Sequence, residues 1–176
     1  MSTQTQRGHR PPPRPSRSPG APPELTFQWE SFRDISTEGL KLWKQHYAEI
    51  ALDRDVCQLD PDWAEYHALD EAGVLRILTA RSRNGSLVGY VFCRVGGHSH
   101  YSSTRFAHLE MFWLHPYFRK GWQPVKMFGE VLRGLKNDGV QIVTVNFKLH
   151  FKDGRVGKLL ARLGFAPTDI VLRRRL

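Results

Sequence analysis

Residues 105–149 hold the pattern that most restricts the fold, two β-rich segments separated by a helical one. Arg105 to Leu114 predicts a long strand ended by Pro116, and apolar side chains recur at helical spacing from Pro124 onward. Asn137-Asp138-Gly139 ends that helix, and Val140 to Leu149 predicts the second strand. Strands that are joined through a helix within one sheet run parallel. The chain is therefore expected to build a sheet with at least one parallel pair.

The residues before this crossover begin with one strand and two helices. Leu25 to Phe32 alternates in polarity, as a strand does, and either Asp34 or Ser36 is placed to cap the helix that follows. Asp60-Pro61-Asp62 predicts the start of a second, shorter helix, because proline is tolerated in a first helical turn. Gly73 is expected to end it.

A hairpin and a last helix and strand complete the order. Asn84-Gly85, between Leu75–Arg81 and Leu87–Val95, is a strong signal for an antiparallel hairpin. Asp153-Gly154 opens the last helix, and Phe165 to Arg173 predicts a final strand. The order β-α-α-β-β-β-α-β-α-β predicts an α/β (α+β) fold, with a mixed sheet and helices on both faces.

The first 23 residues differ in composition from the rest. They contain seven of the 11 prolines, four of the 26 basic residues and none of the 17 acidic residues. Such a stretch cannot bury enough apolar surface to offset its chain entropy, so residues 1–23 are predicted to be a disordered arm and residues 24–176 a single domain. The arm is interpreted as a solvated tail or a nonspecific electrostatic arm that could bind nucleic acid. Pro12 to Arg17 also fits a P-x-x-P-x-R ligand pattern, although any Pro/Arg-rich tail can produce such a match by chance.

Several classes of protein are excluded by what the sequence lacks. It has no run of about 18 apolar residues for a membrane span and no apolar N-terminal segment for secretion. Cys57 and Cys93 are too few for a disulfide framework and lack C-x-x-C spacing. His98 and His100 have no third ligand at a suitable spacing, so no metal is expected. A soluble, cytoplasmic protein without membrane contact is the expectation.

The segment from Leu114 to Pro124 is the most informative for function. Here a strand leads into a basic, glycine-containing turn, and the turn leads into a helix. Backbone N–H groups at such a helix start point toward one spot, and Arg119 and Lys120 add positive charge. This arrangement suits a phosphate or pyrophosphate. The alternative is an ordinary basic loop.

With these elements in place, residues 24–176 resemble the GCN5-related N-acetyltransferase (GNAT) superfamily. The resemblance rests on the element order, the L-x-P-x-x-R segment from Leu114 to Arg119, and Gly164-Phe165 before the last strand. The run from Phe112 to Trp122 is especially similar to small acetyltransferase-like proteins of bacteriophages and prophages. The resemblance implies a mostly antiparallel sheet of six to seven strands, one central parallel crossover and about four helices.

The resemblance also implies a binding site for acetyl-CoA. In the family, an R/Q-x-x-G-x-G/A turn binds the pyrophosphate, and pantetheine lies along the end of the preceding strand. When the family motif is carried over onto this chain, the implied turn residues are Arg119, Lys120, Gly121, Trp122, Gln123 and Val125. The implied strand residues are Phe112, Trp113 and Leu114. The chain departs from the motif: Trp122 and Pro124 stand at the two glycine positions, and Gly121 comes one place early. Pro124 has no N–H to donate.

The implied catalytic residue is Glu110, four residues before Leu114, acting as a base directly or through water. The alternative is a carboxylate paired with a nearby arginine or with His108. The family often places a tyrosine acid four residues before the late Gly-Phe, but here that residue is Leu160, and His150 and Tyr117 are possible substitutes.

Two functions from different classes follow from these residues. The first is transfer of an acetyl group from acetyl-CoA to an amine of a protein, a small molecule or an aminoacyl-tRNA. The second is a catalytically degenerate protein of the same fold that binds a host protein or nucleic acid. The acceptor is not predicted, because the segments expected to shape its pocket, residues 53–62 and 96–104, contain no recognisable motif.

Overall fold

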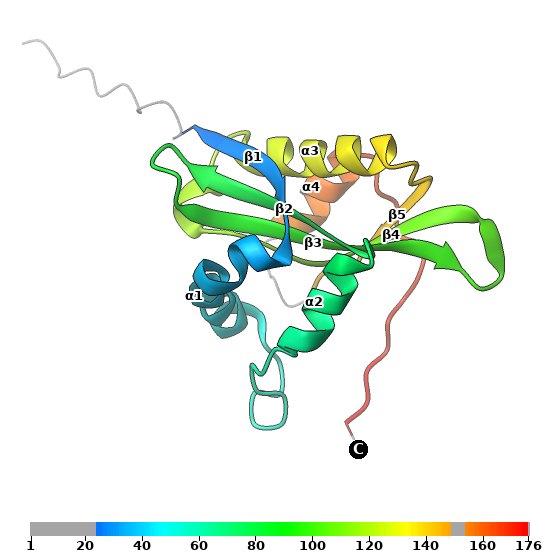
Figure 1. Ribbon diagram of the computed structural model, residues 1–176, viewed down its shortest axis with the longest axis horizontal. Helices are drawn as coiled ribbons and strands as arrows, with labels where there is room; N and C mark the ends of the chain where they lie inside the picture. Colours follow the sequence, from blue (N-terminus) through cyan, green and yellow to red (C-terminus); the bar gives the residue numbers. More distant parts are fainter. Residues whose placement is uncertain (1–23, 149–153, 176) are drawn as a thin grey trace, which may run out of the picture.

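The computed structural model describes residues 24–148 and 154–175 of the chain. Within them, five strands form one mixed sheet in the order β1-β2-β3-β4-β5 (Figure 1). The strands are β1 (Leu25–Glu30), β2 (Leu75–Ser82), β3 (Leu87–His98), β4 (Tyr101–Leu114) and β5 (Ile142–Val145). Neighbours from β1 to β4 are antiparallel, and β5 runs parallel to β4. The arm predicted for residues 1–23 lies outside the described residues.

The helices of the described residues cover both faces of the sheet, as the sequence predicts (Figure 1). α1 (Phe32–Ile50) and α2 (Trp63–Glu71) lie on one face, and α3 (Gln123–Asn137) and α4 (Arg155–Arg162) lie on the other. Each face has its own core because successive side chains of a strand point to opposite sides. The core under α1 and α2 includes Phe32, Ile35, Trp43, Ile77, Tyr90 and Phe92, and the core under α3 and α4 includes Leu78, Val91, Leu109, Phe128, Val131 and Leu160.

The predicted hairpin and crossover are both present. Gly85, in the turn between β2 and β3, has φ of +83°, a conformation that glycine adopts without strain. β4, α3 and β5 form the strand–helix–strand unit, with parallel pairing of Phe106–Leu109 to Ile142–Val145. β3 and β4 also extend beyond their predicted ends, so that His98 pairs with Tyr101. The ring of His98 packs 5.1 Å from that of Tyr101, which supports the extension.

The start of α1 differs from the sequence prediction. Neither Asp34 nor Ser36 is the cap: Ser31 is the N-cap, and its hydroxyl accepts a hydrogen bond from the Asp34 N–H at 3.2 Å. The Asp34 carboxylate in turn accepts from the Ser31 N–H at 3.3 Å, which completes a capping box. β1 therefore ends at Glu30, and Phe32, predicted as its last residue, is the first residue of the helix.

The predicted final strand is wrong. Residues 165–175 form no strand in the structure, so the sheet has five strands in the described residues rather than six or seven. A strand needs a partner edge, and here the tail leads instead to the loop between α1 and α2, where Arg173 pairs with Asp53 and Arg175 with Asp55. The parallel β4–β5 pair consequently lies at the edge of the sheet and not at its centre.

Candidate functional site

The end of β4 extends past its parallel partner. Pairing with β5 stops at Leu109, whereas β4 continues to Leu114 beside β3. A register shift also occurs here: Phe92 pairs with Met111 and Cys93 with Leu109, which leaves Glu110 as the extra residue of a bulge. Bulges increase local twist and end regular pairing. Within the described residues, 110–114 therefore have no strand paired with them on the side where β5 lies. An extended ligand can hydrogen-bond to the backbone N–H and C=O groups on that side.

The side chains of the predicted pantetheine contacts pack into the protein. Trp113 and Leu114 are buried on opposite faces of the sheet, and the half-buried ring of Phe112 packs edge-on against Phe128 at 5.2 Å. What this strand end offers a ligand is therefore its backbone, of which the Leu114 carbonyl already accepts a hydrogen bond from Arg119. That agrees with a ligand held through amide hydrogen bonds rather than through side-chain recognition.

The turn after β4 leads directly to the start of α3. It contains a short 3₁₀ turn at Pro116–Phe118, then Gly121 with φ of +65°. Trp122 is the N-cap of α3, with no side-chain cap hydrogen bond. The Lys126 N–H bonds to the Trp122 carbonyl at 2.9 Å, so the first-turn amides before it, including that of Val125, lie at the positive end of the helix dipole. Gly121 comes one place earlier than the first glycine of the family motif. As a glycine, it adopts this left-handed backbone conformation without strain.

The Arg119 side chain is 36% exposed, but its guanidinium is held by contacts within the protein. Its Nη1 and Nη2 donate to the two carboxylate oxygens of Glu49 on α1, each at 2.6 Å, and its Nε donates to the Leu114 carbonyl at 2.6 Å. The guanidinium also lies 5.6 Å from the Trp113 ring centroid. Hydrogen bonding from Arg119, then from Trp113, lowers the pKa of the Glu49 carboxyl against the opposing effect of burial. The pair is therefore ionised and bidentate.

The outward surface of the turn is cationic and aromatic. Lys120 is exposed, and Tyr117 and Trp122 are 64% and 71% exposed, which is unusual for such large rings. Gln123 is buried at the first position of α3. Of the predicted turn residues, Lys120, Gly121 and Trp122 are thus exposed, while the Arg119 guanidinium is engaged within the protein.

Glu110 lies at the bulge with its carboxylate engaged. Arg94 on β3 donates to it through Nε at 2.9 Å and contacts Glu65 of α2 through Nη2 at 3.2 Å. His108 instead contacts Thr144 at 2.9 Å. The arginine pairing that the sequence left open is therefore present. Assignment of Glu110 as a base stays a prediction.

The candidates for a general acid differ in position. Leu160 is buried in the core under α4, at the place where the family motif has tyrosine. Tyr117 lies on the exposed 3₁₀ turn, and His150 lies outside the described residues. Leu160 itself has no group that can donate a proton.

Two residues near this site are not identified by sequence reasoning. His46 and Glu49 are on α1, where His46 is buried and its Nδ1 lies 2.8 Å from the Tyr90 hydroxyl. His46 follows Trp43 and Leu42 at helical spacing, so its burial could have been predicted from periodicity. Glu49 gives no such signal, because its partners Trp113 and Arg119 are 64 and 70 residues away.

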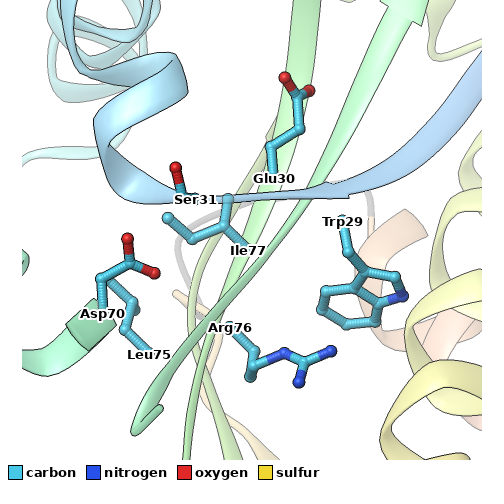
Figure 2. A pocket seen from close by; sticks show the side chains of 7 residues that line it. All are labelled: Trp29, Glu30, Ser31, Asp70, Leu75, Arg76 and Ile77. Atoms are coloured by element: carbon cyan, nitrogen blue, oxygen red, sulfur yellow. The ribbon is translucent and has the colours of Figure 1, made fainter. Parts of the chain in front are cut away.

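A separate hollow of about 190 Å³ lies at the other side of the sheet, between β1, β2 and α2 (Figure 2). Its charged groups already have protein partners. Asp70 accepts from the Phe32 N–H at 2.8 Å, and Arg76 contacts Asp138 at 3.0 Å. The guanidinium of Arg76 also lies 5.1 Å from the Trp29 ring centroid. This hollow is remote from the β4 strand end, and none of the predicted site residues lines it.

The described residues contain neither a membrane-spanning helix nor a cluster of metal ligands. No helix among them is long and apolar enough to cross a membrane. No three histidine, cysteine, aspartate or glutamate side chains among them are grouped as ligands of a metal ion would be.

Comparison with known proteins identifies the fold. No protein-family profile and no curated protein matches the sequence. Among solved structures, a ribosomal-protein-alanine N-acetyltransferase from Brucella melitensis biovar Abortus 2308 is 19% identical over 86% of this chain and 100% of that chain, with a TM-score of 0.62. An aminoglycoside acetyltransferase from an uncultured soil metagenomic sample, in complex with trehalose, is 12% identical over 86% and 96%, with a TM-score of 0.67.

A third structure comes from a complex with coenzyme A. It is the aminoglycoside N-acetyltransferase AAC(6')-Iy bound to CoA, 17% identical over 86% of this chain and 98% of that chain, with a TM-score of 0.62. The chain therefore has the α+β fold of GNAT acetyltransferases. At these identities the likeness concerns the fold alone, and function has to be argued from the site.

Proposed function

We propose that this protein is an N-acetyltransferase that transfers an acetyl group from acetyl-CoA to an amine. The observation that carries the proposal is the end of β4, residues 110–114, which has no strand partner on its β5 side in the part of the chain that the structure describes. This strand end leads into the basic turn at the start of α3. A linear ligand with amides at one end and a diphosphate at the other matches both parts in their order along the chain. Coenzyme A has this chemistry, and the fold has neighbours that bind it.

In the proposed complex, the turn binds the diphosphate. Lys120 supplies an exposed positive charge, and the first-turn amides of α3, Val125 among them, supply donors at the positive end of the helix dipole. Pro124 removes one donor from this set. The pantetheine amides pair with the backbone of residues 112–114, which also points the thioester toward Glu110.

The reaction requires a group that accepts the proton of the amine, and it releases the coenzyme A thiolate as the leaving group. The free amine attacks the thioester carbonyl carbon, the C–N bond forms, and the C–S bond breaks with release of the coenzyme A thiolate. Glu110 accepts the amine proton directly or through water, with Arg94 holding its carboxylate in place. A thiol with a pKa near 8.5 is a weak enough base to leave as thiolate and take a proton from water, so loss of the tyrosine acid does not prevent the step.

The acceptor class is an amine-bearing molecule. Glu65 and Glu110 share the single cation of Arg94, so this group of three side chains carries one net negative charge, which favours a cationic acceptor. The neighbours are named for acetylation of a ribosomal protein or of aminoglycosides, which supports protein and small-molecule amines as candidates. The aminoacyl-tRNA amine is a candidate from the sequence alone. Kinship with phage proteins and a cytoplasmic location remain predictions of the sequence.

The proposal is tested by thiol release from acetyl-CoA with three acceptors: a lysine-rich peptide, an aminoglycoside and an aminoacyl-tRNA. We expect turnover with at least one of them. Glu110→Gln should lower kcat by about 100- to 10,000-fold while coenzyme A affinity, measured by calorimetry, stays near the unmodified value. Glu71→Gln, an exposed residue at the end of α2, is the control. Failure of millimolar acetyl-CoA to raise the melting temperature would refute the proposal, because a ligand of the native state must stabilise it.

The second candidate is a protein of this fold that has lost catalysis. Its support is Leu160 in the tyrosine position and Pro124 in the turn. The basic arm predicted for residues 1–23 would then bind nucleic acid or a host protein. A salt-dependent shift of DNA or RNA that disappears when residues 1–23 are deleted, together with no turnover, would favour it.

A further inference from the structure

Arg119 is held by a dense set of contacts within the protein. Its guanidinium makes two parallel hydrogen bonds to Glu49, both at 2.6 Å, and a third to the Leu114 carbonyl, also at 2.6 Å. Glu49 accepts a further hydrogen bond from the Trp113 indole at 2.8 Å. We call these four residues the clamp. The fork-to-carboxylate geometry is the strongest form of such a pair.

The clamp connects three parts of the molecule that are far apart in the sequence. Glu49 is at the end of α1, Trp113 and Leu114 end β4, and Arg119 lies in the turn that leads to α3. Within the turn, the His115 N–H bonds to the Val88 carbonyl at 2.8 Å and Phe118 packs against the core under α3 and α4. Tyr117 and Trp122 are exposed, and Trp122 makes no side-chain cap hydrogen bond. Arg119 therefore ties the outer part of the turn to α1.

The same contacts make Arg119 a poor ligand for a diphosphate. All three nitrogens of its guanidinium are engaged, and its charge is neutralised by a carboxylate 2.6 Å away. An approaching diphosphate would also meet the negative charge of Glu49. Lys120 is adjacent and exposed, so the geometry leaves the ligand role to it and to the first-turn amides of α3.

We infer that Arg119 is a positioning residue: with Glu49 it clamps the turn of residues 115–122 onto α1, and it does not bind the diphosphate itself. The inference rests on the proposed function for the identity of the ligand. It assigns Glu49, on a helix distant in sequence, a part in holding the site.

Substitution of Glu49 separates a positioning role of Arg119 from a ligand role, because the two roles predict different changes in coenzyme A affinity. If Arg119 is a clamp residue, Glu49→Gln loosens the turn and weakens coenzyme A binding, by about tenfold for one lost charge-assisted contact. If Arg119 is instead a diphosphate ligand that Glu49 competes for, Glu49→Gln leaves the affinity unchanged or increases it, and that result would overturn the inference. Calorimetric titration with coenzyme A measures the effect.

Two further variants provide the controls. Arg119→Lys keeps the positive charge but cannot make the bidentate pair and the Leu114 bond together, so it should weaken coenzyme A binding nearly as much as Arg119→Ala. Retention of affinity in Arg119→Lys would contradict the clamp. Lys120→Ala should weaken coenzyme A binding but leave the affinity for S-acetylpantetheine, which has no diphosphate, unchanged.

A measurement without ligand keeps this inference separate from the proposed function. Amide hydrogen exchange in residues 115–126 should become faster in both Glu49→Gln and Arg119→Ala, and no faster in the double variant than in either single one. If the unmodified protein does not bind coenzyme A but exchange follows this pattern, the proposed function fails and the clamp stands. Unchanged exchange in both variants would overturn the clamp whatever the protein binds.

Discussion

His46 shows how one buried side chain constrains the region beside the site. It lies on the inner face of α1, with Nδ1 2.8 Å from the hydroxyl of Tyr90, and both residues are buried. Burial lowers the pKa of His46 to about 4; the charge of Glu49 acts in the opposite direction, and that of Arg119 adds to the lowering. The imidazole is therefore neutral in the folded protein near neutral pH. Burial likewise raises the pKa of Tyr90, which keeps its hydroxyl protonated.

The pKa of His46 predicts a pH dependence of stability. Because the folded-state pKa, about 4, is below the unfolded value near 6.5, the unfolded state binds more protons between these limits. The free energy of unfolding should fall as pH drops from about 6.5 to 4, by up to about 3 kcal/mol from this residue. His46→Gln should remove that part of the slope in urea unfolding series, and exposed His98→Gln should not. A slope unchanged by His46→Gln would contradict the assignment.

At the scale of elements, the packing of α3 on the sheet depends on one glycine. A Cβ at Gly134 would lie 2.4 Å from the indole of Trp29 on β1, whereas a Cβ at Gly129, in the same helix, would meet nothing within 4 Å. α3 can therefore approach β1 closely only where it has no side chain. The same indole also contacts the guanidinium of Arg76 on β2, so the contact involves three elements.

These two glycines make a matched pair of substitutions. Gly129→Ala should raise the free energy of unfolding by about 1 kcal/mol, because alanine is the better helix former. Gly134→Ala gains the same propensity but forces the Trp29 ring to move, and overpacking costs about 1–3 kcal/mol. We expect the first variant to melt at a higher temperature than the unmodified protein and the second at a lower one. Equal stabilisation by both would show that α3 does not pack against Trp29.

The elements that the sequence predicts well are those with local signals. Asn84-Gly85 specifies its own hairpin, and the β4–α3–β5 crossover follows from a strand, a helix and a strand of suitable length. The cap of α1 lies at Ser31, three residues before Asp34, because Asp34, a good N-cap by type, serves as the partner in a capping box. The prediction of a final strand at residues 165–173 is wrong because a strand needs a free sheet edge to pair with. The sequence of the segment itself does not show whether such an edge is available.

The sequence indicates which segment forms the candidate site, but not which residues pair with its charged side chains. The basic turn, its glycine and the strand end are consecutive in the chain, so the Leu114–Val125 segment can be recognised from the sequence alone. The partners of its charged residues cannot be recognised in this way. Arg119 is paired with Glu49, and Glu110 with Arg94, through contacts made only when the sheet and α1 assemble.

At the scale of the whole molecule, the site lies where the two layers of helices meet the splayed edge of the sheet. α1 contributes Glu49 from one face, and α3 contributes its N-terminus from the other, with the β4 strand end between them. The two cores lie on opposite sides of the same strands, and β4 contributes Trp113 to one and Leu114 to the other. The fold thus brings the β4 strand end and the start of α3, the two parts of the candidate site, next to each other.

A crystal structure grown with coenzyme A tests the central claim most directly. The account predicts the diphosphate within hydrogen-bonding distance of the Lys120 side chain and the first-turn amides of α3, the pantetheine amides along residues 112–114, and Arg119 still on Glu49. Coenzyme A seated in the β1–β2 hollow, or anywhere other than the β4 strand end, would contradict it.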